Sequence, residues 1–250
     1  MSDQLSSMDI HADRMISVRE RLIFEADKKR KKDHSEPLYL ESAFEKLHVR
    51  EYRGKRLFDI TAGIFGMVAF LLLTPFIALG IKLSSRGPVF FKQTRTGKNG
   101  IPFTCYKFRT MYNVGRDEGS VDEPDITTKG DPRVFSFGKF LRFLNLDELP
   151  QILNVFKGDM SLVGPRPYPV DECAWWNSSF DDFFYRYAVR PGITGFAQVR
   201  GYRGGTLNEE HMRKRTDYDL IYVQKNSLLF DVKTIAQTVT QMVNLQTNGH

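Results

Sequence analysis

The stretch KRLFDITAGIFGMVAFLLLTPFIALGIKLSSRG, residues 55–87, holds an uncharged run that extends from Ile60 to Ile81. As a helix that rises about 1.5 Å per residue, this run would be about 33 Å long. The hydrocarbon core of a bilayer is about 30 Å thick, so the run is long enough to cross a membrane. Its length and composition predict a membrane helix.

A proline inside the run favours a re-entrant hairpin over a span. Pro75 removes one helical hydrogen bond, and its ring clashes with the preceding turn. The segment before it, Ile60–Thr74, would be only about 22 Å long, which is too short to cross. Thr74 can return its hydroxyl to a freed carbonyl and so support a sharp bend. We therefore expect a helix–break–helix hairpin that turns at Thr74 and Pro75.

Basic residues on both sides of the run favour the same topology. Lysine and arginine tend to stay on the cytoplasmic side of a membrane protein, so both ends of the hairpin are expected there. Lys55 and Asp59 are expected to anchor the hairpin rather than to react. The flanking basic residues are Lys46, Arg50, Arg53, Lys55 and Arg56 before the run, and Lys82, Arg86, Lys92, Arg95 and Lys98 after it.

The chain is expected to divide into three parts. Residues 1–50 form a charged extension, partly helical or disordered, whose cationic run Lys28–Lys32 leaves docking onto anionic headgroups open. Residues 51–86 form the hairpin, and residues 87–250 form a cytoplasmic domain. Its fold class is expected to be α+β and mainly helical, with a short β-hairpin joined at Asn99-Gly100 and interfacial amphipathic helices. Helical periodicity is present in residues 134–144, 146–157 and 211–243.

Composition narrows the class of partner. The net charge of +6 favours nucleic acid, an anionic membrane face or phosphorylated substrates. The hydrophobic share of 41% is enough for a packed core. Cys105 and Cys173 are too few for a disulfide framework, which favours a reducing compartment.

A second stretch, NLDELPQILNVFKGDMSLVGPRP at residues 145–167, sets two carboxylates side by side. Asp147 and Glu148 fit a helix beginning in which Asn145 is the N-cap and Glu148 completes a capping box. Capping and catalysis are both open for this pair. The two roles are compatible, because a carboxylate held at the positive end of a helix dipole stays ordered and ionised.

Basic residues surround this pair in the sequence. Arg142 lies shortly before it, Lys107 and Arg109 end the second predicted strand, and Arg166 follows. Single basic residues are usually solvated or paired. Several that converge on two acids next to a membrane suggest a phosphorylated substrate, with a divalent cation on a carboxylate.

Several ordered blocks resemble one known family. They are KR..D before the apolar run, GPVFFKQTRTG, YKFRTM, LDELPQILNVFKGDMSLVGPRP, VRPGITGFAQV and YDLIYV. Over residues 55–243 the chain resembles the bacterial sugar transferase family of monotopic phosphoglycosyl transferases, and among them the members that transfer a hexose 1-phosphate to undecaprenyl phosphate.

The resemblance implies an enzyme that moves a sugar-1-phosphate from a UDP-sugar to undecaprenyl phosphate and releases UMP. It implies that Asp147 is the nucleophile on the β-phosphate and forms a covalent aspartyl-phosphosugar intermediate. It also implies that Glu148 helps to hold Mg²⁺. A carboxylate suits this step, because the acyl phosphate that it forms keeps the transfer potential of the diphosphate.

The resemblance also assigns binding roles around the two acids. Arg142 is the candidate for phosphate contact, and Lys107 and Arg109 are further candidates. Arg166 is implied as a nucleotide contact. Pro165 and Pro167 flank it and are expected to fix the backbone there.

Location and partners follow from the same resemblance. The enzyme would be monotopic in the bacterial inner membrane, with its catalytic domain facing the cytoplasm, in contact with membrane lipids and with no nucleic acid. It would carry out the first membrane step of exopolysaccharide, capsule or other glycoconjugate synthesis. A homodimer and contacts with downstream glycosyltransferases stay open.

Departures from the family pattern bear on the sugar. QVRGYRGGT resembles the QVNG.RGET pattern of members that use glucose or galactose, but Arg200 and Gly205 replace the usual Asn and Glu. Phe143 stands where many relatives carry a second basic residue. A UDP-hexose is expected, and an N-acetylated UDP-sugar stays open as the alternative.

Two functions of other kinds also stay open. A non-catalytic, membrane-attached basic adaptor would explain the charge and the anchor, but not why the acids, PRP and KFRTM occur together. A glycosyltransferase that moves the sugar without its phosphate would release UDP instead of UMP.

Overall fold

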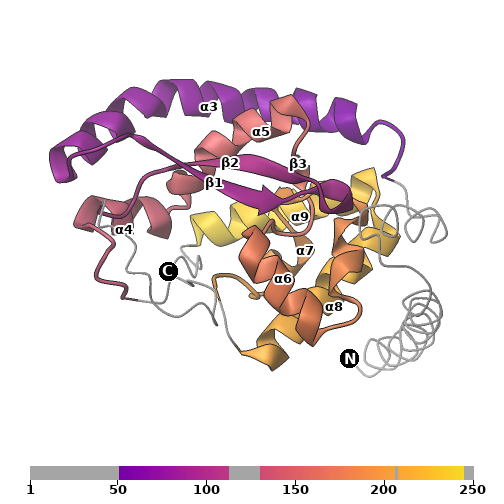
Figure 1. Cartoon of the computed structure of the whole chain (residues 1–250). Helices are drawn as coiled ribbons and strands as arrows, with labels where there is room; N and C mark the ends of the chain where they lie inside the picture. The colour runs from indigo at the N-terminus through magenta and orange to yellow at the C-terminus, as the bar shows by residue number, and fades with distance from the viewer. Residues whose placement is uncertain (1–50, 113–129, 206–207, 245–250) are drawn as a thin grey trace.

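The computed structural model describes residues 51–112, 130–205 and 208–244, and Figure 1 shows their arrangement. The expectations for residues 1–50 lie outside this part of the chain. Within it, the protein is mainly helical with two small two-stranded sheets, in line with the predicted α+β class. The helices are α3 (Lys55–Ser84), α4 (Ser136–Phe143), α5 (Ile152–Lys157), α6 (Val170–Ser179), α7 (Phe196–Val199), α8 (Glu209–Lys225) and α9 (Leu228–Val243). The 3-10 segments are η1 (Lys98–Gly100), η2 (Leu146–Gln151) and η3 (Phe183–Ala188), and the strands are β1 (Phe90–Thr96), β2 (Pro102–Phe108), β3 (Ser161–Val163) and β4 (Gly192–Thr194).

Helix α3 has 30 residues and lies along one side of the molecule, at the top of Figure 1. By length and composition it could cross a membrane, since its most apolar window has a mean hydropathy of 2.4. Only 17% of that window is buried, whereas the core helix of a soluble protein would be mostly buried. Phe65, Phe76 and Leu83 are 80%, 74% and 80% exposed. An exposed apolar face of this size marks an interaction surface.

The predicted break at Thr74 and Pro75 does not divide α3, which continues through both residues as one helix. The Thr74 hydroxyl donates to the carbonyl of Phe70 and not to that of Leu71, the carbonyl that Pro75 leaves without a backbone donor. Proline removes one helical hydrogen bond, but the apolar residues on either side offer the backbone no other partner. The flanking turns therefore stay helical, and the two helices expected from the sequence are one element.

Strands β1 and β2 form the predicted antiparallel hairpin, which lies beside α3. Asn99 and Gly100 adopt φ angles of 57° and 77°, the positive values that this pair tolerates. Phe108 of β2 stacks on Phe90 at a ring distance of 5.4 Å and on Phe70 of α3 at 6.1 Å. These rings hold the hairpin against α3.

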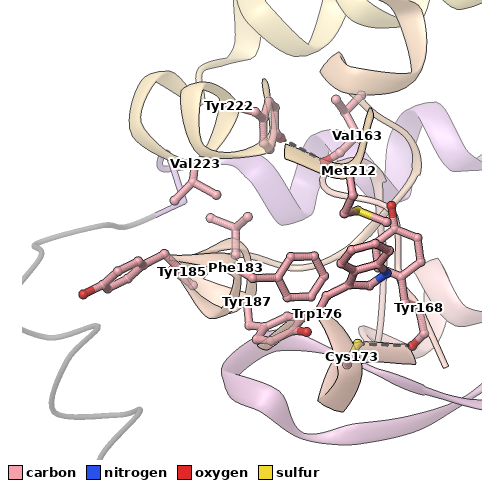
Figure 2. Packing of buried hydrophobic residues seen from close by; sticks show 12 residues of the cluster. Val163, Tyr168, Cys173, Trp176, Phe183, Tyr185, Tyr187, Met212, Tyr222 and Val223 are labelled. Atoms are coloured by element: carbon pink, nitrogen blue, oxygen red, sulfur yellow. Dashed lines mark hydrogen bonds between the residues drawn. The ribbon is translucent and has the colours of Figure 1, made fainter. Parts of the chain in front are cut away.

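Two buried clusters make up the hydrophobic core. The first lies between α3, β2, α4 and α5 and includes Ile81, Phe108 and Leu141. The second packs α6, η3 and α8 together around Trp176 and Phe183, as Figure 2 shows. Strands β3 and β4 pair in parallel at the junction between the clusters, and the two acids of interest follow α4 on the side of the first cluster.

Buried charges hold the first turn of α3. The Lys55 ammonium donates to Asp231 of α9 at 2.5 Å and to the carbonyl of Val163 in β3 at 3.0 Å. Asp59 accepts from the Ser161 hydroxyl at 2.8 Å. These contacts fit the anchoring role expected for Lys55 and Asp59. We call Lys55, Asp59 and Asp231 the anchor cluster.

Candidate active site

The two adjacent acids lie on η2, a short 3-10 turn between α4 and α5. Asn145 precedes the turn with a φ of 55°, and no side-chain hydrogen bond caps it. The predicted capping box does not form between these described residues, because the Glu148 carboxylate contacts basic side chains instead of the backbone. A charge-assisted hydrogen bond is roughly twice as strong as a neutral one, which explains the preference.

Glu148 lies between two basic side chains. Its Oε1 is 2.6 Å from Lys107 Nζ and 2.7 Å from Arg166 Nη2, and its Oε2 is 3.2 Å from Arg166 Nη1. Burial alone would raise the pKa of Glu148, but Arg166 and Lys107 hold that pKa well below its usual range. Glu148 therefore stays ionised, and it orders a lysine from β2 and an arginine from the segment after β3.

Asp147 is buried beside Glu148, with 8% of its surface exposed. In the described structure its carboxylate takes no part in the ion pairs that hold Glu148. Burial raises the pKa of Asp147, while the nearby Lys107 charge lowers it in part. Asp147 is thus less stabilised as an anion than its neighbour, and it lies within reach of positive charge. These are the properties of a carboxylate that can react with an anion.

Arg142 is brought to the two acids from the last turn of α4. Its Nε donates to the Thr110 hydroxyl at 2.9 Å, which orients the guanidinium. Burial lowers the pKa of Arg142, and the charge of Asp147 partly restores it. Arg142 is therefore close enough to Asp147 for their charges to affect each other. We call Asp147, Glu148, Lys107, Arg142 and Arg166 the acid–base cluster.

Arg109, another predicted phosphate contact, is not brought to this cluster. It is buried and donates to the carbonyl of Pro88 at 2.6 Å. It also donates to the hydroxyl and to the carbonyl of Ser85, both at 2.8 Å. Arg109 thus ties the end of α3 to the end of β2, which is a structural position.

The segment Pro165–Pro167 follows β3 and carries Arg166 to Glu148. Its two prolines have no backbone N–H, so its backbone is held through carbonyl oxygens. The carbonyl of Pro167 accepts from Nη1 of Arg95, a buried residue of β1, at 2.7 Å. The segment is therefore fixed by the β-hairpin on one side, as expected for a binding loop with restricted backbone.

Sequence reasoning missed three buried charges that support the site and the anchor. Asp231 pairs with Lys55, and Arg186 pairs with Asp219 at 2.6 Å. Arg186 stands in the aromatic stretch FFYRYA, and Asp219 stands in YDLIYV. A charged residue inside an otherwise apolar stretch is the signal that could have identified each as a buried, paired group.

The carboxylates of the acid–base cluster are the candidate ligands for the predicted Mg²⁺. Among the described residues, no group of three or more His, Cys, Asp and Glu side chains lies together. Mg²⁺ is usually bound by one or two carboxylates together with substrate phosphates and water. Asp147 and Glu148 fit such a site, but both oxygens of Glu148 already contact basic side chains. The residues therefore fit a Mg²⁺ ion that the phosphates of a substrate help to bind.

Several curated proteins with related sequences are named as transferases that act on undecaprenyl phosphate. A UDP-glucose:undecaprenyl-phosphate glucose-1-phosphate transferase of Caulobacter vibrioides is 44% identical over 191 residues, which are 76% of this chain and 69% of that protein. The enzyme of the same name from Escherichia coli is 43% identical over 188 residues, 74% of this chain and 39% of that protein.

A third relative carries another sugar in its name. It is the UDP-N-acetylgalactosamine-undecaprenyl-phosphate N-acetylgalactosaminephosphotransferase of Aeromonas hydrophila, which is 40% identical over 185 residues, 74% of this chain and 42% of that protein. The chain thus spans less than half of the length of the Escherichia coli and Aeromonas relatives.

The profile of one protein family, described as Bacterial sugar transferase, matches residues 50–245. The match includes the β1–β2 hairpin, the acid–base cluster and the anchor cluster, and it covers well over half of the chain. This protein therefore belongs to the bacterial sugar transferase family.

Proposed function

We propose that this protein transfers a sugar-1-phosphate from a UDP-sugar to undecaprenyl phosphate and releases UMP, as a first membrane step of polysaccharide synthesis. The observation that carries the proposal is the arrangement of Asp147. It is a buried carboxylate outside the ion pairs of its neighbour, next to positive charges from β2, α4 and the Pro165–Pro167 segment. The names of the relatives supply the donor and the acceptor.

In the first half-reaction, an oxygen of Asp147 attacks the β-phosphorus of the UDP-sugar. A bond forms between that oxygen and phosphorus, and the bond from phosphorus to the bridging oxygen breaks. The bridging oxygen leaves with UMP, and the sugar-1-phosphate stays on Asp147 as an acyl phosphate. No general base is needed, because Asp147 attacks as an anion.

Positive side chains lower the barrier to an attack by one anion on another. Arg142 and Lys107 lie near Asp147, where they can stabilise the charge on the transferred phosphoryl group. Arg166 would bind the nucleotide phosphates once they compete with Glu148 for its guanidinium. Glu148 would help to hold Mg²⁺, which supplies further charge stabilisation at the phosphates when bound.

In the second half-reaction, a phosphate oxygen of undecaprenyl phosphate attacks the same phosphorus. The bond to Asp147 breaks, the carboxylate is restored, and the lipid diphosphate sugar is released. Two half-reactions suit substrates from two phases. The soluble nucleotide sugar can react and its UMP can leave before the lipid phosphate arrives along the membrane surface.

We propose that α3 enters the membrane as one helix without crossing it and keeps both of its ends on the cytoplasmic side, so that this site lies at headgroup level. Both ends of α3 support the proposal, because both bind the same domain. Its first turn contacts Asp231 through Lys55, and Ser85, the residue that follows its last turn, accepts from Arg109. A spanning helix would place these two ends on opposite faces of the membrane, where one domain could not bind both.

Cysteine labelling tests this topology in intact cells and in inverted vesicles. Single cysteines at residues 51–53 and 86–88 are expected to react only with a reagent present on the cytoplasmic side. Labelling of either segment from the periplasmic side would show that α3 spans the membrane.

A product assay tests the reaction. The purified chain is incubated with Mg²⁺, undecaprenyl phosphate and labelled UDP-glucose, UDP-galactose or UDP-N-acetylgalactosamine. We expect UMP and a lipid-linked sugar, with a UDP-hexose preferred over the N-acetylated donor. Release of UDP would indicate a glycosyltransferase. Absence of nucleotide release from every donor would favour the adaptor function.

A further inference from the structure

The loop that carries Arg166 is held almost entirely through its carbonyl oxygens. The Pro165 carbonyl accepts from the Gly192 N–H at 2.9 Å, and the Pro167 carbonyl accepts from Arg95 at 2.7 Å. The carbonyl of Arg166 itself lies between these two contacts. The side chain that donates to the Arg166 carbonyl therefore holds the backbone of Arg166 in place, and the Arg166 side chain binds Glu148.

That donor is Arg186 of η3. Its Nη2 donates to the Arg166 carbonyl at 2.8 Å and to Oδ2 of Asp219 at 2.6 Å, and its Nε donates to the same Oδ2 at 3.1 Å. Asp219 belongs to α8. One guanidinium therefore connects the binding loop to a helix that contributes no residue to the acid–base cluster.

The Arg186–Asp219 pair is buried and enclosed by aromatic rings. The two side chains are only 1% and 2% exposed. The guanidinium carbon of Arg186 lies 4.4 Å from the centre of the Tyr168 ring and 4.9 Å from that of Phe183, and Figure 2 shows these two rings in the second core cluster. A guanidinium stacked and paired in this way has little freedom to move.

A buried ion pair needs an explanation other than stability. Apolar residues of similar volume often serve stability equally well, since taking two charges out of water is costly. The Arg186–Asp219 pair also donates a hydrogen bond to the backbone of the loop that carries Arg166, and apolar residues cannot donate one.

We infer that Arg186, held by Asp219, is a positioning residue that sets Arg166 for the nucleotide phosphates. The inference rests on the proposed function, in which Arg166 binds the donor. Arg186 acts through the Arg166 carbonyl and is shielded from the substrate. Its loss should therefore affect the reaction with the UDP-sugar and not the binding of undecaprenyl phosphate.

The test replaces the pair by apolar residues in the full chain, as Arg186→Met with Asp219→Leu. Such a replacement avoids an unpaired buried charge and is expected to leave the melting temperature near that of the wild type. We expect kcat/KM for the UDP-sugar to fall by about 10-fold to 100-fold, the usual effect of losing a residue that orients a ligand-binding group. The kcat/KM for undecaprenyl phosphate should stay unchanged, because it reports only the second half-reaction.

A second pair between the same parts of the chain is the matched control. Arg213 of α8 pairs with Asp182, the residue before η3, at 2.6 Å, and contacts no residue of the Pro165–Pro167 segment in the described structure. Arg213→Met with Asp182→Asn is expected to leave kcat/KM unchanged. Equal losses of melting temperature in both double variants, with unchanged kcat/KM per folded enzyme, would overturn the inference.

A cycle with Arg166→Ala tests whether Arg186 acts through Arg166. Removal of the Arg186–Asp219 pair should cause no further loss of kcat/KM in that background, because residues that act as a unit are not additive. Full additivity would contradict the inference.

If the apolar double variant fails to fold, Arg186→Lys takes its place. Lysine keeps the charge but not the planar fork, so a loss of kcat/KM is still expected, and a folded lysine variant with wild-type kcat/KM would also contradict it.

Failure of the proposed function would be visible separately. If the wild type releases UMP from no donor, the reaction is wrong, and calorimetric binding of UDP then decides the positioning role. Weaker UDP binding in the Arg186→Met, Asp219→Leu variant, but not in the control pair, would support that role. Equal binding in both would refute it.

Discussion

The anchor cluster and the acid–base cluster are both buried sets of acids and bases, but they differ in how their charges are satisfied. In the anchor cluster, Asp231 accepts from Lys55, from the Tyr52 hydroxyl and from the Tyr222 hydroxyl. In the acid–base cluster, Glu148 is paired with two bases, whereas its neighbour Asp147 is not part of those pairs.

This difference separates a cluster that holds elements together from one that can react. Neutral hydroxyls and a backbone carbonyl complete the contacts around Lys55 and Asp231, and the remaining oxygen of the cluster, Oδ2 of Asp59, is buried without a hydrogen-bond partner. Because Lys55 and Asp59 are only 3% and 0% exposed, the cluster is closed to a ligand from solvent. Around Glu148 the partners are the charged ends of Lys107 and Arg166, whose side chains are 15% and 20% exposed and can exchange this carboxylate for a phosphate. Burial and charge alone therefore do not mark a candidate site, and the unequal environments of two neighbouring acids are the feature that makes Asp147 and Glu148 the candidate here.

The sharpest test of the comparison is Asp147→Asn. We expect UMP release to fall at least about 10³-fold, because the amide cannot form the acyl phosphate. Burial raises the pKa of Asp147, so the folded state disfavours its anion, and the neutral amide should leave the melting temperature equal or higher. UMP release and thermal unfolding are measured together, and near-native release would remove Asp147 as the nucleophile.

The second test is Lys55→Met, which should affect stability instead. Removing one partner of a buried pair leaves Asp231 and Asp59 without their cation, at a cost of about 3–5 kcal/mol. The control is Lys98→Met, because Lys98 is 38% exposed in its pair with Glu51, and such a pair contributes at most about 1 kcal/mol. Chemical denaturation measures both. A Lys55 variant as stable as the Lys98 variant would mean that the anchor cluster does not hold α3.

The third and smallest effect concerns pH. Asp147 attacks as an anion, so UMP release should decline as pH falls through its pKa, which burial raises above the ordinary aspartate value of 3.8. The Lys107 charge lowers that pKa in part, so Lys107→Met should move the decline to higher pH. Lys157→Met is the control, since Lys157 is exposed and bonds to the Tyr106 hydroxyl. A decline at the same pH in both variants would show that Lys107 does not act on Asp147.

Local sequence signals predicted the elements of the fold well. The Asn99-Gly100 pair predicted the hairpin, because its preference for positive φ depends only on those two residues. The uncharged run predicted α3. The predicted break at Pro75 is not observed. One proline costs a single helical hydrogen bond, whereas the flanking residues keep many, and the prediction considered only the proline.

Sequence signals predicted the site only where its residues are close in the chain or stand in family blocks. Asp147, Glu148, Arg142, Lys107 and Arg166 come together as expected. Arg109 does not, because it lies just beyond the end of β2 and donates to the carbonyls of Ser85 and Pro88, which follow α3. The buried ion pairs that support the site join residues that are far apart in sequence. No local sequence pattern predicts which buried charges will pair.

Asn145 is one of two non-glycine residues with positive φ in the described chain, and it immediately precedes the turn that carries both acids. Asparagine accepts this left-handed conformation more readily than most side chains, and a β-branched residue resists it. The start of the turn that carries Asp147 and Glu148 thus includes a left-handed backbone conformation at Asn145. For protein engineering, a substitution at Asn145 could therefore change the orientation of the two acids without altering any charged residue.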